Sequence, residues 1–186
     1  MARPLGPRGQ GRARVLTAAL EQFAEHGVSG TSLQMIADHL GVTKAAVYYQ
    51  FKAKEDIVLA VLEPAFAQMR GFVSAGEAAT SPDEAAEMTM ENLVDLMIDH
   101  RQVVAALSRD PEVERIVESH PEFRSLTQRL GELLLGPDPD PRRRVAVSVL
   151  GAGLAHVGMD PLLADLDDAV LRDELLPLNR MLLNRE

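Results

Sequence analysis

A short segment near the N-terminus, Thr43–Phe51, carries side chains that could bind a nucleic acid. Its sequence is TKAAVYYQF. As a helix it would bury Val47 and the final phenylalanine on one face, which leaves Lys44, Tyr48 and Tyr49 to face elsewhere. A phenol can donate a hydrogen bond to a phosphate oxygen, and its ring can lie along a sugar or a thymine methyl group. The segment therefore indicates a groove-binding helix; the alternative is two core-edge tyrosines with their hydroxyls in water.

Lys54 stands where the next helix is expected to begin, which is an unfavourable position for a cation. A positive charge in the first turn opposes the helix dipole and destabilises the helix slightly. A DNA phosphate bound there would be held both by the backbone N–H groups and by the ammonium. The preceding Ala53 is a poor N-cap, so we expect Glu55 and Asp56 in the first turn to meet the dipole instead.

Charge is distributed unevenly along the chain, although the net charge of −9 would by itself argue against a polyanionic partner. Residues 1–54 carry seven basic groups and three acidic ones, a net of +4, so the remainder sums to −13. A basic module on an acidic body is attracted to phosphate at one end and repelled at the other. Solvated surface charge is the alternative interpretation.

Three expected helices position the basic module's side chains. The first runs from residue 12 to Gly27, and the second follows a capping box of Thr31 and Gln34. Gly41 separates the second helix from the third, which is the tyrosine-bearing segment. Two short helices joined by a glycine turn, with a third packed behind them, form the helix-turn-helix arrangement, in which the second of the two enters the major groove.

The rest of the chain also predicts helices. No alternating β-pattern of useful length is present, and several Pro residues stand where the first turn of a helix is expected. These starts are Ser81-Pro82, Asp110-Pro111, His120-Pro121 and Asp140-Pro141. We therefore predict an all-α fold of about nine helices.

The stretch from Val15 to Val61 closely resembles, without a gap, the N-terminal domain of the TetR/AcrR family of transcriptional regulators. The residues that carry the resemblance are Phe23, Gly27, Thr31, Ile36, Ala37, Gly41, Val42, Tyr48, Phe51, Lys54 and Glu55. Residues 1–11 combine Pro, Gly and Arg without periodicity, so we expect a flexible basic arm there. The resemblance implies a helix-turn-helix domain (12–53) and a larger helical domain (54–186) for effector binding and dimerisation. It also implies a homodimer that binds a palindromic double-stranded DNA operator, usually as a repressor, and releases it when a small molecule binds.

The resemblance further implies which residues contact DNA. The family's phosphate-contacting positions fall on Thr31, Ser32, Tyr48 and Lys54, and its base-contacting positions on Gln34, Lys44, Ala45, Ala46 and Tyr49; Thr43 and Gln50 complete the expected DNA-binding set. Family members often have a small polar residue or Gly where this chain has Ala45-Ala46, and His in place of Gln50. The alanine pair removes hydrogen-bonding reach, so base readout is expected to rest on Lys44 and Tyr49.

An effector pocket is expected in the C-terminal part, where six of the eight Met residues follow position 54. Flexible thioethers suit an adaptable apolar pocket for a largely apolar effector, although Met also fills gaps in ordinary cores. The expected apolar lining is Phe66, Met69, Met90, Met97 and Phe123, with Asn92, His100 and His120 as polar contacts.

Two helices near the C-terminus, 142–157 and 166–183, are expected to form the dimer interface, since they combine apolar residues with Gly151, Ala152 and Gly153. Burial of both helices within the monomer is the alternative.

Other functions leave weaker signals. Glu91, Asp95 and Asp99 form a like-charge row at i, i+4 and i+8, which fits a solvated or Arg-paired face, or else a cation-binding wall. An all-α enzyme or metal protein using this row and the histidines is the alternative function. No zinc signature, GxSxG motif or complete dinucleotide fingerprint is present, so we predict no catalysis, cofactor or metal.

With no Cys and no apolar run near about 20 residues, we expect a cytoplasmic protein without a membrane segment.

Overall fold

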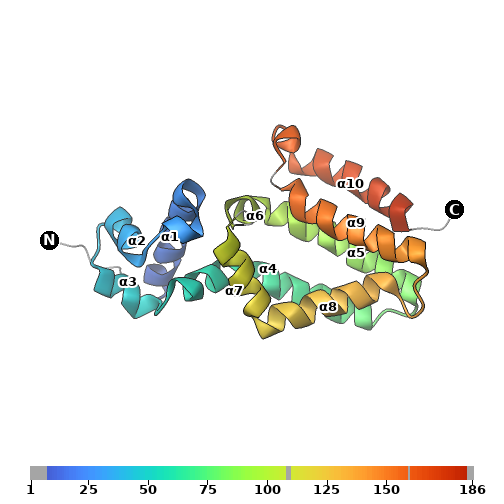
Figure 1. The fold of residues 1–186 in the computed structure, drawn as a ribbon, viewed down its shortest axis with the longest axis horizontal. Coiled ribbons are helices and arrows are strands. Elements are labelled where there is room, and N and C mark those ends of the chain that lie inside the picture. The colour runs from blue at the N-terminus through green and yellow to red at the C-terminus, as the bar shows by residue number, and fades with distance from the viewer. Residues whose placement is uncertain (1–7, 108–109, 159, 184–186) are drawn as a thin grey trace. The chain divides into compact units, whose positions relative to one another are not determined.

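The computed structural model describes residues 8–107, 110–158 and 160–183, and this part of the chain is all-α, as predicted (Figure 1). It contains ten α-helices and one 3₁₀ helix, and no strand. The helices are α1 (Arg8–Gly30), α2 (Leu33–Leu40), α3 (Lys44–Gln50), α4 (Lys54–Glu77), α5 (Pro82–Asp99), α6 (Arg101–Leu107), α7 (Pro111–Ser119), α8 (Pro121–Leu135), α9 (Pro141–Val157), η1 (Pro161–Leu163) and α10 (Asp168–Leu183).

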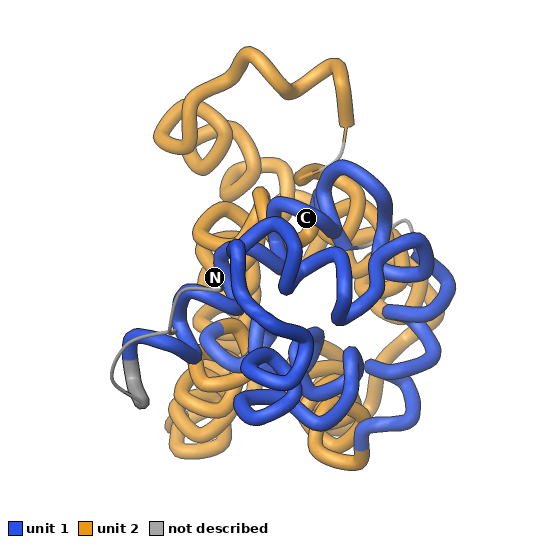
Figure 2. The backbone as a smooth tube through the Cα atoms, turned by 90° about the vertical axis from the view of Figure 1, so that its left-hand side faces the viewer, with its two compact units in different colours: residues 1–64, 105–120 blue, residues 65–104, 121–186 orange. Residues whose placement is uncertain are grey.

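The chain divides into two compact units (Figure 2). Unit 1 comprises residues 1–64 and 105–120, and unit 2 comprises residues 65–104 and 121–186. The segment 12–53 lies in unit 1. Unit 1 also takes in the first part of α4 and all of α7, which sequence reasoning had assigned to the C-terminal domain.

Unit 1 is built on α1, against which α2, α3 and α7 pack. Its core consists of apolar side chains at helical spacing: Val15, Ala18, Ala19, Phe23, Val28, Ile36, Ala37, Val47, Phe51, Ile57, Val58 and Val113. Helix α1 begins at Arg8, so residues 8–11 of the expected arm are helical, and residues 1–7 lie outside the described part. Gly11 is buried, and its packing offsets its low helix propensity.

Unit 2 packs α5 against α8, α9 and α10. Its core includes Met90, Val94, Ile98, Leu134, Ala146, Leu150, Leu154, Leu171, Leu176 and Leu183. The predicted helix starts are confirmed: Ser81, Asp110 and Asp140 are N-caps with Pro in the first turn, and α8 begins at Pro121. Helix starts that depend on proline and N-cap residues can therefore be predicted from the sequence without knowledge of the packing.

Helix α4 is, within the described ranges, the one helix long and apolar enough to cross a membrane by length and composition. It differs from a lipid-exposed span in that Ile57, Val58 and Val73 are fully buried in the protein and Phe66 nearly so. These side chains identify it as a core helix of the two units.

Candidate nucleic-acid interface

The turn between α2 and α3 is fixed by local chemistry. Gly41 adopts a left-handed conformation (φ 67°, ψ 31°) that ends α2. The Thr43 hydroxyl then accepts a hydrogen bond from the backbone N–H of Ala46 (3.2 Å) and begins α3, as predicted. Val42 and Val47, on either side of this cap, are both buried. These contacts hold α3 at a set angle to α2, as a helix-turn-helix requires.

The outer face of α3 presents the side chains expected to meet DNA. Tyr48 is 50% exposed and Tyr49 60% exposed, whereas Val47 between α3 and the core is fully buried. Lys44 and Ala45 are also exposed. The ammonium of Lys52 lies 4.9 Å from the centre of the Tyr48 ring. Large aromatic side chains kept at the surface, beside two cations, make a surface suited to a polyanion.

The start of α2 differs from the expected capping box. Ser32 is the N-cap and accepts from the N–H of Met35 (3.2 Å). Thr31 is buried, and its hydroxyl donates to the carbonyls of Gln22 (3.1 Å) and Gly27 (2.7 Å). Because these bonds occupy its hydroxyl, Thr31 neither caps α2 nor lies on the exposed face; it stabilises the turn beneath it.

The other expected contact residues lie around this face. Ser32 and Gln34 are exposed at the start of α2, and the Gln34 amide donates to the Asp38 carboxylate at 2.7 Å. Ala46 and Gln50 are only half-exposed on α3. The structure thus gathers the exposed members of the expected set on α2 and α3.

The first turn of α4 is capped from within, as the poor capping residue Ala53 requires. One oxygen of the Asp56 carboxylate accepts hydrogen bonds from the backbone N–H groups of Lys52 and Ala53, both at 3.0 Å. Asp56 therefore supplies the negative charge that the helix N-terminus favours. This confirms for Asp56 the role that was expected of both Glu55 and Asp56.

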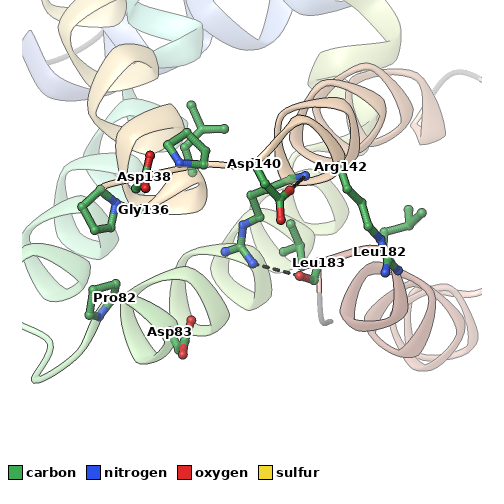
Figure 3. Close-up of a pocket in the computed structure, with 12 residues that line it drawn as sticks. Pro82, Asp83, Gly136, Asp138, Asp140, Arg142, Leu182 and Leu183 are labelled. Carbon is green, nitrogen blue, oxygen red and sulfur yellow. Dashed lines mark hydrogen bonds between the residues drawn. The ribbon is translucent and has the colours of Figure 1, made fainter. Parts of the chain in front are cut away.

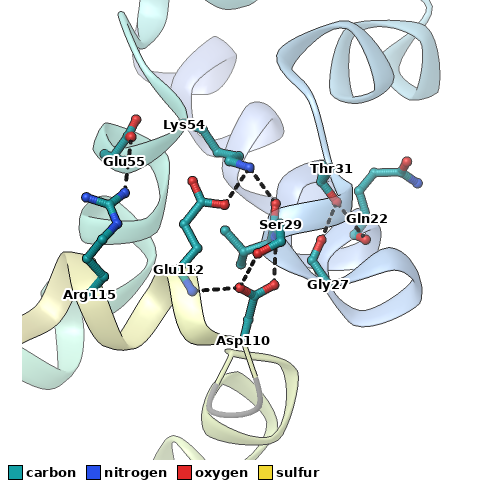
Figure 4. Close-up of polar contacts among 10 residues, drawn as sticks. Gln22, Gly27, Ser29, Thr31, Lys54, Glu55, Asp110, Glu112 and Arg115 are labelled. Atoms are coloured by element: carbon teal, nitrogen blue, oxygen red, sulfur yellow. Dashed lines mark hydrogen bonds and ion pairs between the residues drawn. The ribbon is translucent and has the colours of Figure 1, made fainter.

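Lys54 does not extend freely into solvent. Its ammonium lies 2.8 Å from the carboxylate of Glu112 and donates to the Val28 carbonyl at 2.7 Å (Figure 4). The side chains of Lys54 and Glu112 are only 18% and 22% exposed. The one cation at the start of α4 is thus held by an acid of α7, which lies far away in the sequence.

Asp110, the N-cap of α7, connects α7 to α1 next to the pair of Lys54 and Glu112. Its carboxylate accepts from the Ser29 backbone N–H and the Ser29 hydroxyl, both at 2.6 Å, and from the Glu112 N–H at 2.9 Å. Burial works to raise the pKa of Asp110, but these hydrogen bonds together outweigh it and hold the pKa below its ordinary value. The charged carboxylate therefore stabilises the docking of α7 on the last residues of α1, beyond the break at Gly27.

This geometry predicts an acid-dependent contribution to stability. We expect Asp110→Asn to lower the free energy of unfolding at neutral pH. Because the folded-state pKa lies below the ordinary value of 3.8, the contribution is fully present above that value and is lost as pH falls through the folded-state pKa. Urea titrations at several pH values should show wild type and variant differing above about pH 5 and converging at the acid end. A difference that stays constant down to about pH 2 would contradict this role.

Residues expected to bind an effector are brought together only in part. The rings of Phe66 and Phe123 have centroids 5.5 Å apart, and the His100 ring contacts the Gln68 amide oxygen at 2.9 Å. Asn92 donates to the Met88 carbonyl at 2.7 Å, so its amide is used within α5. Met69 and Met90 are buried, and Met97 packs against the unit 2 core.

His120 belongs to unit 1, whereas the other seven expected effector residues belong to unit 2. Sequence spacing could not reveal this, because the division between units falls between His120 and Pro121.

Comparison with known proteins agrees with the helix-turn-helix geometry. Residues 15–61 match the family model described as "Bacterial regulatory proteins, tetR family". The repressor KstR2 of Mycolicibacterium smegmatis is 29% identical over 169 residues, which cover 87% of this chain and 72% of KstR2. Residues 15–61 of this chain therefore form a TetR-family domain.

Some relatives match over a much shorter stretch than KstR2 does. The regulator SrpR of Pseudomonas putida is 47% identical over 51 residues, so the match spans about a quarter of each protein, 27% of this chain and 24% of SrpR. The solved structure of KstR2 from Mycobacterium tuberculosis covers 94% of this chain and 95% of its own, with a TM-score of 0.69 and 18% identity. That structure supports the fold over the whole chain.

The acidic row on α5, Glu91, Asp95 and Asp99, is paired with arginines and an amide. Glu91 contacts Arg180, Asp95 lies 2.6 Å from Arg172, and Asp99 accepts from Gln68 at 2.9 Å. The interpretation of an Arg-paired face is therefore confirmed. No group of three or more His, Asp or Glu residues that could hold a metal ion occurs among the described residues.

The pockets of the structure do not coincide with the expected effector residues. A pocket of about 620 Å³ in unit 2 lies between the starts of α5 and α9 and the end of α10 (Figure 3), and Arg143 is one of its lining residues. Arg143 donates to the carbonyls of Leu134 (2.7 Å) and Leu183 (2.9 Å), so it ties helix ends together. None of the eight expected residues lines this pocket, the hollow of about 650 Å³ beside α1 and the first part of α4, or the hollow of about 490 Å³ beside the ends of α4 and α8.

Sequence reasoning missed Thr89 on α5. Its side chain is fully buried, and its hydroxyl has no hydrogen-bond partner in the described part of the chain. Gly76 lies opposite, where an added Cβ would come within 3.0 Å of that hydroxyl and 2.9 Å of Leu133. A Thr in a helix usually signals nothing in a sequence, and only the packing of α4, α5 and α8 isolates this hydroxyl.

Proposed function

We propose that this TetR-family transcriptional regulator is a repressor that binds a palindromic operator as a homodimer and releases it when a small molecule binds. The observation that carries the proposal is the exposed face of α3, with Lys44, Tyr48 and Tyr49 on a helix-turn-helix frame. A role in DNA binding explains why a seven-residue helix keeps two tyrosines at the surface.

Individual roles follow from position. Lys44, in the first turn of α3, is the strong donor placed to read guanine in the major groove, with Tyr49 beside it. Tyr48 and the exposed Ser32 at the start of α2 are placed to contact phosphate oxygens. Phosphate contacts position the helix, and the base contacts supply sequence preference.

A homodimer is supported by an exposed apolar surface on α9 and α10, called here the α9–α10 face. Val145 is 63% exposed, Val149 52% and Met181 61%. A side chain at Gly151 or Gly153 would meet nothing within 4 Å, so a partner helix can approach closely there. Other residues of the two helices, such as Leu150 and Leu171, are buried in the monomer and do not belong to this face.

The effector is proposed to be a largely apolar molecule bound in unit 2. Support comes from relatives: one neighbour is described as a ketosteroid regulator, and FadR of Bacillus subtilis, 16% identical with a TM-score of 0.60, was solved in complex with stearoyl-CoA.

Selection of bound duplexes from a random DNA library, followed by a gel shift, tests the proposal. We expect an enriched sequence with two inverted half-sites. Lys44→Ala should weaken binding to it by about 1 to 3 kcal/mol and relax the preference at one base pair in each half-site. Lys52→Ala is the matched control, which removes a cation outside α3 and should weaken all duplexes alike. No enrichment, or an unchanged base preference in Lys44→Ala, would contradict the proposed readout.

A further inference from the structure

The pair formed by Lys54 and Glu112 joins a residue at the DNA-binding end of α4 to the first turn of α7. Both side chains are mostly buried, so salt and water screen the pair less than a surface ion pair. Glu55 and Arg115 form a second, looser contact between the same two helices, at 3.8 Å. The two pairs differ in exposure, since Arg115 and Glu55 are 64% and 45% exposed.

The donors of Lys54 are largely used within the protein. An ammonium has three N–H groups, and two protein oxygens, from Glu112 and Val28, lie within 2.8 Å of it. A phosphate at the start of α4 must therefore share the ammonium with a carboxylate or displace it. The carboxylate also adds negative charge where a second negative group is to bind, which opposes binding.

Asp110 keeps Glu112 in this position. Its carboxylate accepts hydrogen bonds from the Ser29 N–H and hydroxyl and from the Glu112 backbone N–H, so the first turn of α7 is anchored to the last residues of α1, beyond its break at Gly27 (Figure 4). The Asp110 carboxylate thus holds the backbone of Glu112 in place, and this positions the Glu112 carboxylate beside Lys54.

We propose that Glu112 is an internal competitor of DNA phosphate for Lys54, and that it sets the affinity of the protein for DNA below what its cations alone would give. The inference rests on the proposed DNA-binding function. Removing the charge of Glu112 releases the ammonium to the phosphate, which tightens binding to any duplex and adds one ionic contact to the complex.

The test compares Glu112→Gln with Glu114→Gln. Glu114 lies in the same first turn of α7, is exposed and carries the same charge, so its substitution controls for net charge and for the helix dipole. With a mixed-sequence duplex at low salt, Glu112→Gln should bind about fivefold more tightly than wild type. The slope of log K against log salt should steepen by about 0.9, whereas Glu114→Gln should leave the slope unchanged.

A second comparison assigns the effect to Lys54. In the Lys54→Met variant, adding Glu112→Gln should increase the affinity for the duplex no more than adding Glu114→Gln does. If circular dichroism shows Glu112→Gln to be unfolded, Glu112→Asp replaces it, because the shorter side chain keeps the charge but withdraws the carboxylate from Lys54, and it should also tighten binding.

The two hypotheses fail differently. If wild type and all variants bind no duplex at low salt, the proposed DNA-binding function is wrong and this inference falls with it. If wild type binds and Glu112→Gln binds no more tightly than Glu114→Gln, or gains equally without Lys54, the competition is overturned and the DNA-binding function stands.

Discussion

Gly27→Ala is expected to destabilise the protein by about 3 to 4 kcal/mol. Gly27 interrupts α1 at φ 72° and ψ 165°, a region that is essentially restricted to glycine. An added Cβ would also lie 3.1 Å from one oxygen of Asp110. That oxygen accepts the Ser29 N–H bond at 2.6 Å, so backbone strain and a weakened charged hydrogen bond add together.

Gly30→Ala is the matched control for this prediction. Gly30 lies three residues further along, its φ is not positive, and its nearest neighbour to an added Cβ is His26 at an ordinary 3.6 Å. Urea unfolding followed by circular dichroism should place Gly30→Ala within about 1 kcal/mol of wild type. Equal losses in the two variants would show that the conformation of Gly27 and its contact with Asp110 contribute nothing special.

Most helix boundaries could be predicted from the sequence because they depend on neighbouring residues. Asp140-Pro141 and Thr43 begin helices through their own side chains and backbones, and Gly41 ends one through its left-handed conformation. The break between α5 and α6 was not predicted. It falls at His100, with neither Gly nor Pro to mark it, and so the count of helices came out one too low.

Long-range partners explain most of what the sequence did not show at the site. The exposed face of α3 follows from the spacing of Val47 and Phe51, and the structure confirms it. The prediction that Thr31 caps α2 was wrong because its hydroxyl bonds to the carbonyl of Gln22, nine residues away, and not to the first turn of α2. The partner of Lys54 lies on α7, and no local pattern around Glu112 distinguishes it from Glu114.

Val149→Glu is expected to convert the proposed dimer to a monomer and to reduce operator affinity by about 100-fold or more. Val149 is 52% exposed on the α9–α10 face, between the exposed Val145 and Gly153 on the same helix. In a two-fold symmetric interface each substitution appears twice, so two carboxylates would be buried without partners. A monomer reaches only one half-site at a time and loses the joint binding of two.

Leu162→Glu is the control, since Leu162 is 84% exposed in η1 and lies outside α9 and α10. Sedimentation equilibrium should show this variant to be a dimer with wild-type operator affinity, while Val149→Glu is monomeric with helical content unchanged by circular dichroism. A dimeric Val149→Glu would place the interface elsewhere on the protein. A monomeric variant that still binds the operator as wild type does would separate dimerisation from DNA binding, because the joint binding of two half-sites requires two linked α3 helices.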